Sequence, residues 1–132
     1  MNSVKVFSPA SIGNIGPGFD VLGLAIDGLG DTVEARKISG NEVVIENIFN
    51  ADHDISNNPD KNTAGIAAKE TLRALDIKNG VGLTLTKGMP SGSGLGSSAA
   101  SAAAGAYAVN ELFNGGLSED ELILAAMKGE AY

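Results

Sequence analysis

Residues 81–104 read VGLTLTKGMPSGSGLGSSAASAAA, and this stretch decides the fold because it joins a strand, a glycine-rich loop and a helix. Positions 81–87 alternate between apolar and polar side chains, which predicts a strand. The glycines that follow at every second position permit positive φ angles and a close approach of the backbone to a ligand. The run of small residues from Ser97 onward predicts a helix that ends near Phe113.

Working outward from this stretch, the same patterns predict the remaining elements. Strands are predicted at 4–8, 32–38 and 42–48, and Gly40-Asn41 predicts a hairpin turn between the last two. A helix is predicted at 62–75. We expect its inner face to carry Ile66, Leu72 and Leu75.

After the central helix, Ser118 and Glu121 form a capping box that predicts the start of a last helix. Strands come first along the chain and are then followed by alternating helices and one more strand. This order predicts an α+β fold in a single domain spanning residues 1–132.

The composition limits which classes of function fit the chain. With 132 residues and 43% hydrophobic side chains, it can form one packed domain, and the absence of cysteine excludes disulfides, thiolate zinc sites and thiol nucleophiles. The net charge is −7 and the nine Lys and Arg residues are scattered, which argues against a nucleic-acid surface. No signal peptide and no long apolar segment is recognisable, so we expect a cytoplasmic protein without membrane association.

The glycine-rich loop has the chemistry of an anion site. At the start of a helix, free N–H groups point outward and attract negative charge, and the hydroxyls of Ser97 and Ser98 can contact phosphate oxygens or Mg²⁺. The Walker pattern does not fit, because no lysine follows Gly96, and the dinucleotide pattern does not fit, because Ser97 takes the place of its last glycine. A glycine- and serine-rich loop that only caps a helix remains the alternative.

Two motifs carry a family resemblance. Residues 90–99, PSGSGLGSSA, match the pattern Pro-x3-Gly-Leu-Gly-Ser-Ser-Ala, and the chain therefore resembles the GHMP kinase superfamily, which includes galactokinases, homoserine kinases and mevalonate kinases. Residues 9–23, PASIGNIGPGFDVLG, are similar to the first motif of homoserine kinases. The resemblance implies a ribosomal protein S5 domain 2-like fold. It also implies that the sequence is a truncated N-terminal ATP-binding domain, with the C-terminal domain of such an enzyme absent.

The same resemblance implies cofactors, a substrate and binding residues. ATP and Mg²⁺ are the expected cofactors and L-homoserine the expected substrate, phosphorylated on its hydroxyl in threonine biosynthesis. No residue is assigned as a catalytic base. The implied ATP-binding residues are Pro90, Ser91, Gly92, Ser93, Gly94, Leu95, Gly96, Ser97, Ser98, Ala99 and Ala100, with Asn62 and Lys87; Ser98 and Glu130 are implied for Mg²⁺, and Asn14 and Asp20 for homoserine.

Simpler roles stand beside several of these assignments. Asn14 and Asp20 can close a turn through their own side chains, and Glu130 can be an ordinary solvated helix residue. His53, between two aspartates in a polar loop, is read as solvated rather than as a metal ligand. The rival functions are another GHMP small-molecule kinase and a non-catalytic ATP-binding module. The fragment alone is expected to be inactive, and a homodimer is left open.

Overall fold

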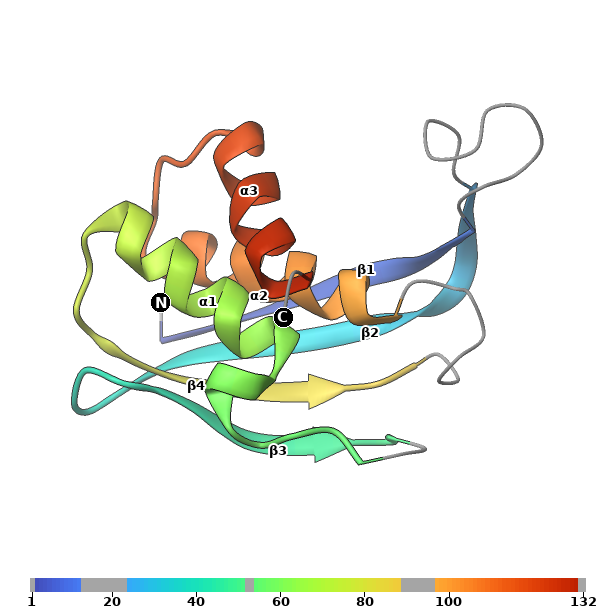
Figure 1. Ribbon diagram of the computed structural model, residues 1–132, viewed down its shortest axis with the longest axis horizontal. Helices are drawn as coiled ribbons and strands as arrows, with labels where there is room; N and C mark the ends of the chain where they lie inside the picture. The colour runs from blue at the N-terminus through green and yellow to red at the C-terminus, as the bar shows by residue number, and fades with distance from the viewer. Residues whose placement is uncertain (1, 13–23, 52–53, 89–96, 131–132) are drawn as a thin grey trace.

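The computed structural model describes residues 2–12, 24–51, 54–88 and 97–130 of the protein. Within these residues, four strands form one sheet and the helices lie over one of its faces (Figure 1), which confirms the predicted α+β class. The elements follow in the order β1 (Ser3–Ile12), β2 (Leu24–Ile38), β3 (Val43–Phe49), η2 (Pro59–Lys61), α1 (Thr63–Leu75), β4 (Gly80–Thr86), α2 (Ser97–Leu112) and α3 (Glu119–Glu130).

The helices form two layers above the sheet. α1 and α2 lie next to each other and contact the strands, whereas α3 packs against the outer side of both (Figure 1). α1 and α2 are therefore covered on two sides, which explains why alanine and glycine are so frequent in them: small side chains allow close approach of neighbouring backbones. No helix within the described residues is long and apolar enough to cross a membrane.

The order of the strands in the sheet is β1-β2-β4-β3, so the predicted hairpin between β2 and β3 is wrong. The turn at Gly40-Asn41 exists, but β4 lies between the two strands that it connects, antiparallel to β2 and parallel to β3. Backbone hydrogen bonds from Gly80 N to Gly40 O (2.8 Å) and from Val81 N to Glu42 O (3.1 Å) fix β4 against the turn. The turn residues thus bind the incoming strand instead of closing a hairpin.

The core lies between the sheet and the two inner helices. Leu83 and Leu85 on the central strand β4 are at most 1% exposed, and burial of a leucine side chain stabilises the fold by about 1.5–3 kcal/mol. On α1, Leu72 is buried as predicted, but Ile66 and Leu75 are only half-buried. The inner positions of α1 are instead taken by alanines, because α2 and α3 pack too closely for larger side chains. The buried alanines of α1 are Ala64, Ala67 and Ala68.

The predicted start of the last helix is confirmed in detail. Ser118 Oγ accepts a hydrogen bond from the backbone N–H of Glu121 (3.2 Å), and the Glu121 carboxylate accepts one from the backbone N–H of Ser118 (3.0 Å). This reciprocal pair is the capping box. It directs α3 back across α1 and α2, so that the end of α3 returns toward the start of both helices (Figure 1).

Candidate functional site

Three helix ends meet at one place in the structure. The Thr63 hydroxyl, at the start of α1, donates a hydrogen bond to the carbonyl oxygen of Ser98 in the first turn of α2 (3.3 Å). Gly129, near the end of α3, packs directly on both helices: a Cβ built at this glycine would lie 2.5 Å from the Thr63 carbonyl oxygen and 3.3 Å from the Ala102 Cβ. The amino-terminal ends of α1 and α2 and the carboxyl-terminal end of α3 therefore converge.

The first turn of α2 lies at the surface, and its role in phosphate binding stays a prediction. Ser98 and Ala99 are exposed and Ala100 is buried, so the helix begins at the surface and enters the core within one turn. A helix start carries free N–H groups and the equivalent of about half a positive charge. The predicted phosphate-binding residues 90–96 precede this turn directly but lie outside the described residues, as do the predicted substrate residues Asn14 and Asp20.

Asn62 caps α1 with both ends of its side-chain amide. Its Oδ1 accepts hydrogen bonds from the backbone N–H groups of Ala64 (3.0 Å) and Gly65 (3.2 Å), and its Nδ2 donates to the Ser56 carbonyl oxygen (2.9 Å). The residue is 3% exposed. Asn62 thus has a structural task at the meeting point of the helices, and its assignment to the nucleotide pocket stays a prediction.

Lys87, the other residue loosely assigned to the nucleotide pocket, is buried in a polar network at the end of β4. Its Nζ lies 2.6 Å from Asp31 Oδ2 and 2.7 Å from Ser101 Oγ. Ser101 Oγ lies 3.1 Å from the same Asp31 oxygen, and the other carboxylate oxygen, Oδ1, accepts the backbone N–H of Gly88 (2.8 Å). The exposed fractions are 0% for Asp31, 8% for Lys87 and 2% for Ser101. The role of Lys87 in ATP binding stays a prediction.

Sequence reasoning missed Asp31 and Ser101 altogether. The available signal was a pair of opposite charges at the ends of two predicted strands: Asp31 directly before 32–38, and Lys87 as the last residue of 81–87. The register pairs Thr32 with Thr86, which places Asp31 and Lys87 next to each other. Without knowledge of the strand register, Asp31 and Lys87 could not be recognised as neighbours.

Gly88, which directly precedes the glycine-rich loop, lies against the backbone of β2. A Cβ built at this position would overlap the carbonyl oxygen of Gly30. Only glycine fits this contact without a shift of one backbone segment. The entrance to the loop is therefore fixed by a hydrogen bond to Asp31 and by close backbone packing on Gly30.

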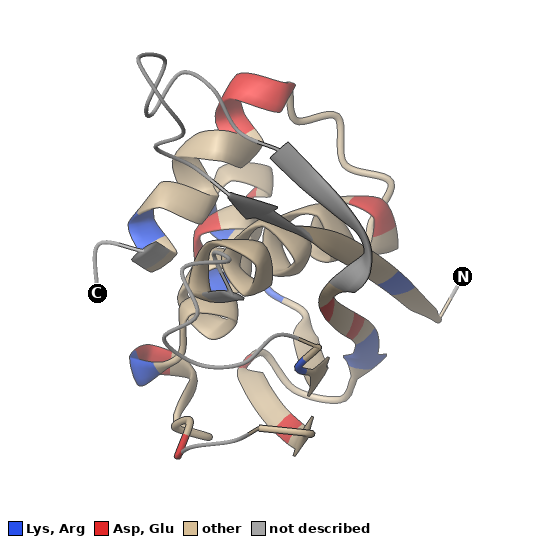
Figure 2. Cartoon of the chain, turned by 90° about the vertical axis from the view of Figure 1, so that its right-hand side faces the viewer, with Lys and Arg blue, Asp and Glu red and all other residues tan. Residues whose placement is uncertain are grey.

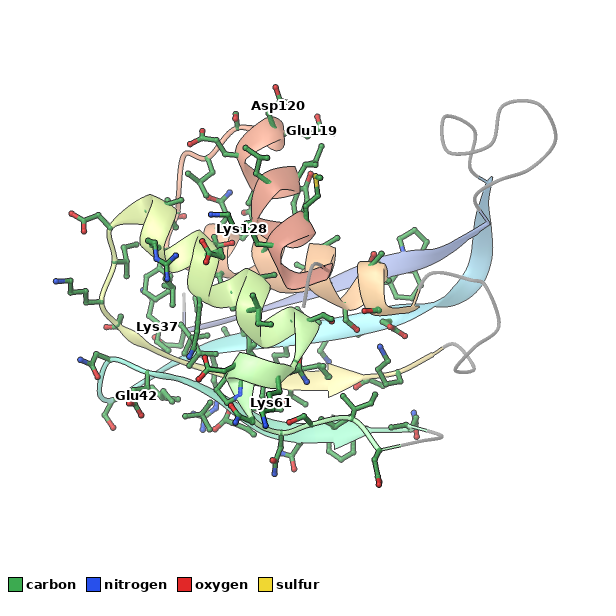
Figure 3. The ribbon with its side chains drawn as sticks, in the orientation of Figure 1. Lys37, Glu42, Lys61, Glu119, Asp120 and Lys128 are labelled. Atoms are coloured by element: carbon green, nitrogen blue, oxygen red, sulfur yellow. The ribbon has the colours of Figure 1, made fainter. Side chains whose placement is uncertain are left out.

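The charges of the described residues are spread over the molecule. Lys and Arg positions are dispersed and several lie next to Asp or Glu (Figure 2). On the helical side, Lys128 of α3 lies 3.3 Å from Glu70 of α1, while Glu119 and Asp120 point outward from the start of α3 (Figure 3). The Lys128–Glu70 contact joins α3 to α1 one residue before Gly129.

A magnesium site where the helix ends converge would take one ligand from the start of α2 and one from the end of α3. Within the described ranges, no three His, Asp or Glu side chains gather as a ready metal cluster. Mg²⁺ usually takes only one or two ligands from protein, with phosphates and waters completing its octahedral shell. Ser98 is exposed in the first turn of α2, and the backbone of Glu130 follows Gly129 at the end of α3; the Glu130 side chain lies outside the described residues. One hydroxyl and one carboxylate are hard oxygen donors that fit this ion.

Comparison with known proteins points to one group of enzymes. Residues 62–132 match the sequence profile described as "GHMP kinases N terminal domain". The chain is 53% identical to a homoserine kinase of Arabidopsis thaliana, over 98% of this chain and 36% of that protein. It is 47% identical to a homoserine kinase of Methanopyrus kandleri, over 97% of this chain and 40% of that protein.

Solved structures give a similar result. The crystal structure of a homoserine kinase from Cytophaga hutchinsonii superposes with a TM-score of 0.92 and 44% identity, covering 98% of this chain and 41% of that one. A mevalonate kinase structure superposes with a TM-score of 0.74 at 24% identity, which is evidence for a shared fold alone. The chain thus spans about two fifths of the length of these homoserine kinases.

Proposed function

Because this chain belongs to the GHMP kinases, we propose that it is the ATP-binding N-terminal domain of a homoserine kinase. The reaction transfers the γ-phosphoryl group of ATP to the hydroxyl of L-homoserine and yields O-phospho-L-homoserine and ADP. The observation that carries the proposal is the similarity to homoserine kinases at 44–53% identity over almost the whole chain. The convergence of helix ends around Ser98 supports it.

The phosphates of ATP are proposed to lie at the first turn of α2. Residues 90–100 would surround them with backbone N–H groups, and the positive end of the helix dipole would favour their charge. Phosphoryl transfer requires little covalent chemistry from the protein, and most of the rate enhancement comes from positioning and charge stabilisation. A site built from a helix start and a closely packed backbone is suited to that task.

Ser98 and Glu130 are the proposed protein ligands of Mg²⁺. When bound, Mg²⁺ supplies positive charge that offsets the charge of the phosphates. The packing of Gly129 on Thr63 and Ala102 supports this pair, because it holds the end of α3 next to the start of α2. Ser98 orients its hydroxyl from one helix end and Glu130 contributes a carboxylate from the other.

The substrate is proposed to bind through Asn14 and Asp20. A carboxylate can accept hydrogen bonds from the ammonium or hydroxyl of homoserine, and a side-chain amide can both donate and accept. Asn62 and Lys87 are retained as nucleotide-pocket residues in the proposal on the family resemblance; Asn62 lies at the start of α1 and Lys87 beside Ser101 of α2. We assign no general base.

The substrate assignment is tested by turnover in a protein that carries this sequence at the length of its curated relatives. We expect steady phosphorylation of L-homoserine and none of mevalonate, while residues 1–132 alone should turn over little homoserine. Turnover of mevalonate alone would favour the rival reading as another GHMP kinase. Nucleotide binding without turnover of either alcohol in the longer protein would favour a non-catalytic ATP-binding module.

Substitution of Ser98 with alanine tests the phosphate site. We expect S98A to lower the affinity for Mg·ATP by roughly 10- to 100-fold, because a hydrogen bond or ligand to a charged group contributes about 1.5–3 kcal/mol. Isothermal titration calorimetry with Mg·ATP measures this loss. The matched control is S118A, the same change at the start of α3, which should cost about 1 kcal/mol of stability and leave nucleotide affinity unchanged. If S98A leaves the phosphate-dependent affinity unchanged, Ser98 is not part of the site.

A further inference from the structure

Asp31 connects both flanks of the predicted phosphate-binding loop from a position deep in the sheet. Its side chain is buried and both of its oxygens have hydrogen-bond partners. Oδ1 accepts the backbone N–H of Gly88, directly before the loop, at 2.8 Å. Oδ2 lies 3.1 Å from the hydroxyl of Ser101, directly after residues 90–100, and 2.6 Å from Lys87 Nζ. One carboxylate therefore bonds to residues on both sides of the predicted ATP-binding segment 90–100, Gly88 before it and Ser101 of α2 after it.

We propose that Asp31 is a positioning residue for the nucleotide phosphates: it fixes Gly88 and Ser101, which lie on either side of the predicted phosphate-binding residues, relative to each other. This inference rests on the proposed function. A loop with both ends fixed loses fewer conformations when it binds a ligand, so less of the binding free energy is spent on ordering it. Asp31 does not contact the nucleotide in this proposal and is not a catalytic residue.

Stability alone is a weak explanation for this network. A buried ion pair can often be replaced by apolar side chains of similar volume without loss of stability, so its presence is poor evidence that it is there to stabilise the fold. The partners of Asp31 are instead the residues that border the loop. Lys87 has a second effect in this geometry: its ammonium neutralises the Asp31 carboxylate, which would otherwise repel phosphates bound nearby.

The contact between Gly88 and Gly30 supports the same role independently. Gly30 precedes Asp31 in β2, and the backbone of Gly88 approaches its carbonyl oxygen too closely for any side chain. Gly88 is thus held against two successive residues of β2, by close backbone packing on Gly30 and by a hydrogen bond to the Asp31 side chain.

The test compares nucleotide binding by the wild-type protein and by D31N. Asparagine keeps the shape of the side chain, but it removes the charge and presents N–H donors toward Lys87 or Gly88. We expect the affinity for Mg·ATP to fall roughly 10- to 100-fold, because a neutral amide bonds to Gly88 and Ser101 less strongly than the Asp31 carboxylate does. The affinity for adenosine, which lacks phosphates, should remain within about twofold. Both are measured by isothermal titration calorimetry.

A control separates positioning from general destabilisation. Thr71 is also fully buried and its hydroxyl donates to the Ala67 carbonyl oxygen (2.9 Å), within α1. T71V should lower stability and leave the affinity for Mg·ATP unchanged. If D31N does not fold, S101A decides the question, because it keeps the Lys87–Asp31 pair and removes one bond at the exit; we expect a loss of about two- to tenfold.

The outcomes distinguish the two proposals. Failure of the wild-type protein to bind Mg·ATP would overturn the proposed function and, with it, the role of Asp31. Wild-type binding combined with unchanged affinity in folded D31N, or in S101A if D31N is unfolded, would overturn the role of Asp31 alone. A loss of the same size for adenosine as for Mg·ATP, or in T71V, would also overturn it, because positioning of phosphates predicts neither.

Discussion

Replacing Lys87 with methionine is expected to lower the free energy of unfolding by about 3–5 kcal/mol, because removal of one partner leaves a buried charge uncompensated. Methionine preserves the length and apolar stem of the side chain, so the loss can be attributed to the ammonium. The Asp31 carboxylate is 0% exposed and would stay in the interior without the Lys87 ammonium, which lies 2.6 Å away in the native protein. Urea unfolding followed by circular dichroism measures the change.

The chain offers a matched control for this substitution. Lys69 forms an ion pair with Asp60 at the surface, where both side chains are substantially exposed. K69M should therefore cost at most about 1 kcal/mol. The double variant D31N/K87M should recover part of the loss, because it removes both charges and the asparagine amide can still bond to Gly88 and Ser101. A loss in K87M no larger than that in K69M would contradict the expected effect of burial.

Substituting Gly129 with alanine is expected to reduce the turnover of homoserine by about 100-fold, because it would displace the end of α3 that carries Glu130. The added Cβ would lie 2.5 Å from the Thr63 carbonyl oxygen and 3.4 Å from the Ala67 Cβ, so α3 or α1 must move. In a helix with free space, a change from glycine to alanine stabilises by about 1 kcal/mol. A net loss of stability here would therefore indicate the clash.

The measurement is a titration of activity with Mg²⁺ in the protein at the length of its relatives. If Glu130 is a metal ligand, G129A should need a higher Mg²⁺ concentration for half-maximal activity and should reach a lower maximum. Gly116 provides the control, since a Cβ built there meets nothing within 4 Å, and G116A should behave as wild type. If turnover and Mg²⁺ dependence are unchanged in G129A, the end of α3 is not part of the proposed site.

The elements closest to the glycine-rich loop could be predicted from the sequence with small errors. The strand predicted at 81–87 is β4 at Gly80–Thr86, and the helix predicted from Ser97 to Phe113 ends at Leu112. These predictions succeeded because alternation, glycine and alanine act locally on the backbone. The capping box of α3 is local in the same sense, with both of its hydrogen bonds formed within four residues.

Features that depend on distant segments could not be predicted. The hairpin between β2 and β3 was the natural local choice, but β4 arrives from more than thirty residues later and pairs with both strands. Asp31 was missed for the same reason, because its neighbours Lys87 and Ser101 are 56 and 70 residues away. The roles of Asn14, Asp20 and residues 90–96 remain predictions from the motifs, since these positions lie outside the described residues.

The strand order also has a consequence for how the chain folds during synthesis. β1 and β2 can pair as soon as both have left the ribosome, because they are antiparallel neighbours. Within the described sheet, β3 pairs only with β4, and the ribosome must add the whole of α1 before β4 emerges. At typical synthesis rates this delay is roughly 2–6 s, during which β3 exposes apolar side chains and an unpaired backbone edge. We therefore expect the nascent chain to be most prone to aggregation when synthesis has passed Phe49 but has not yet reached Thr86.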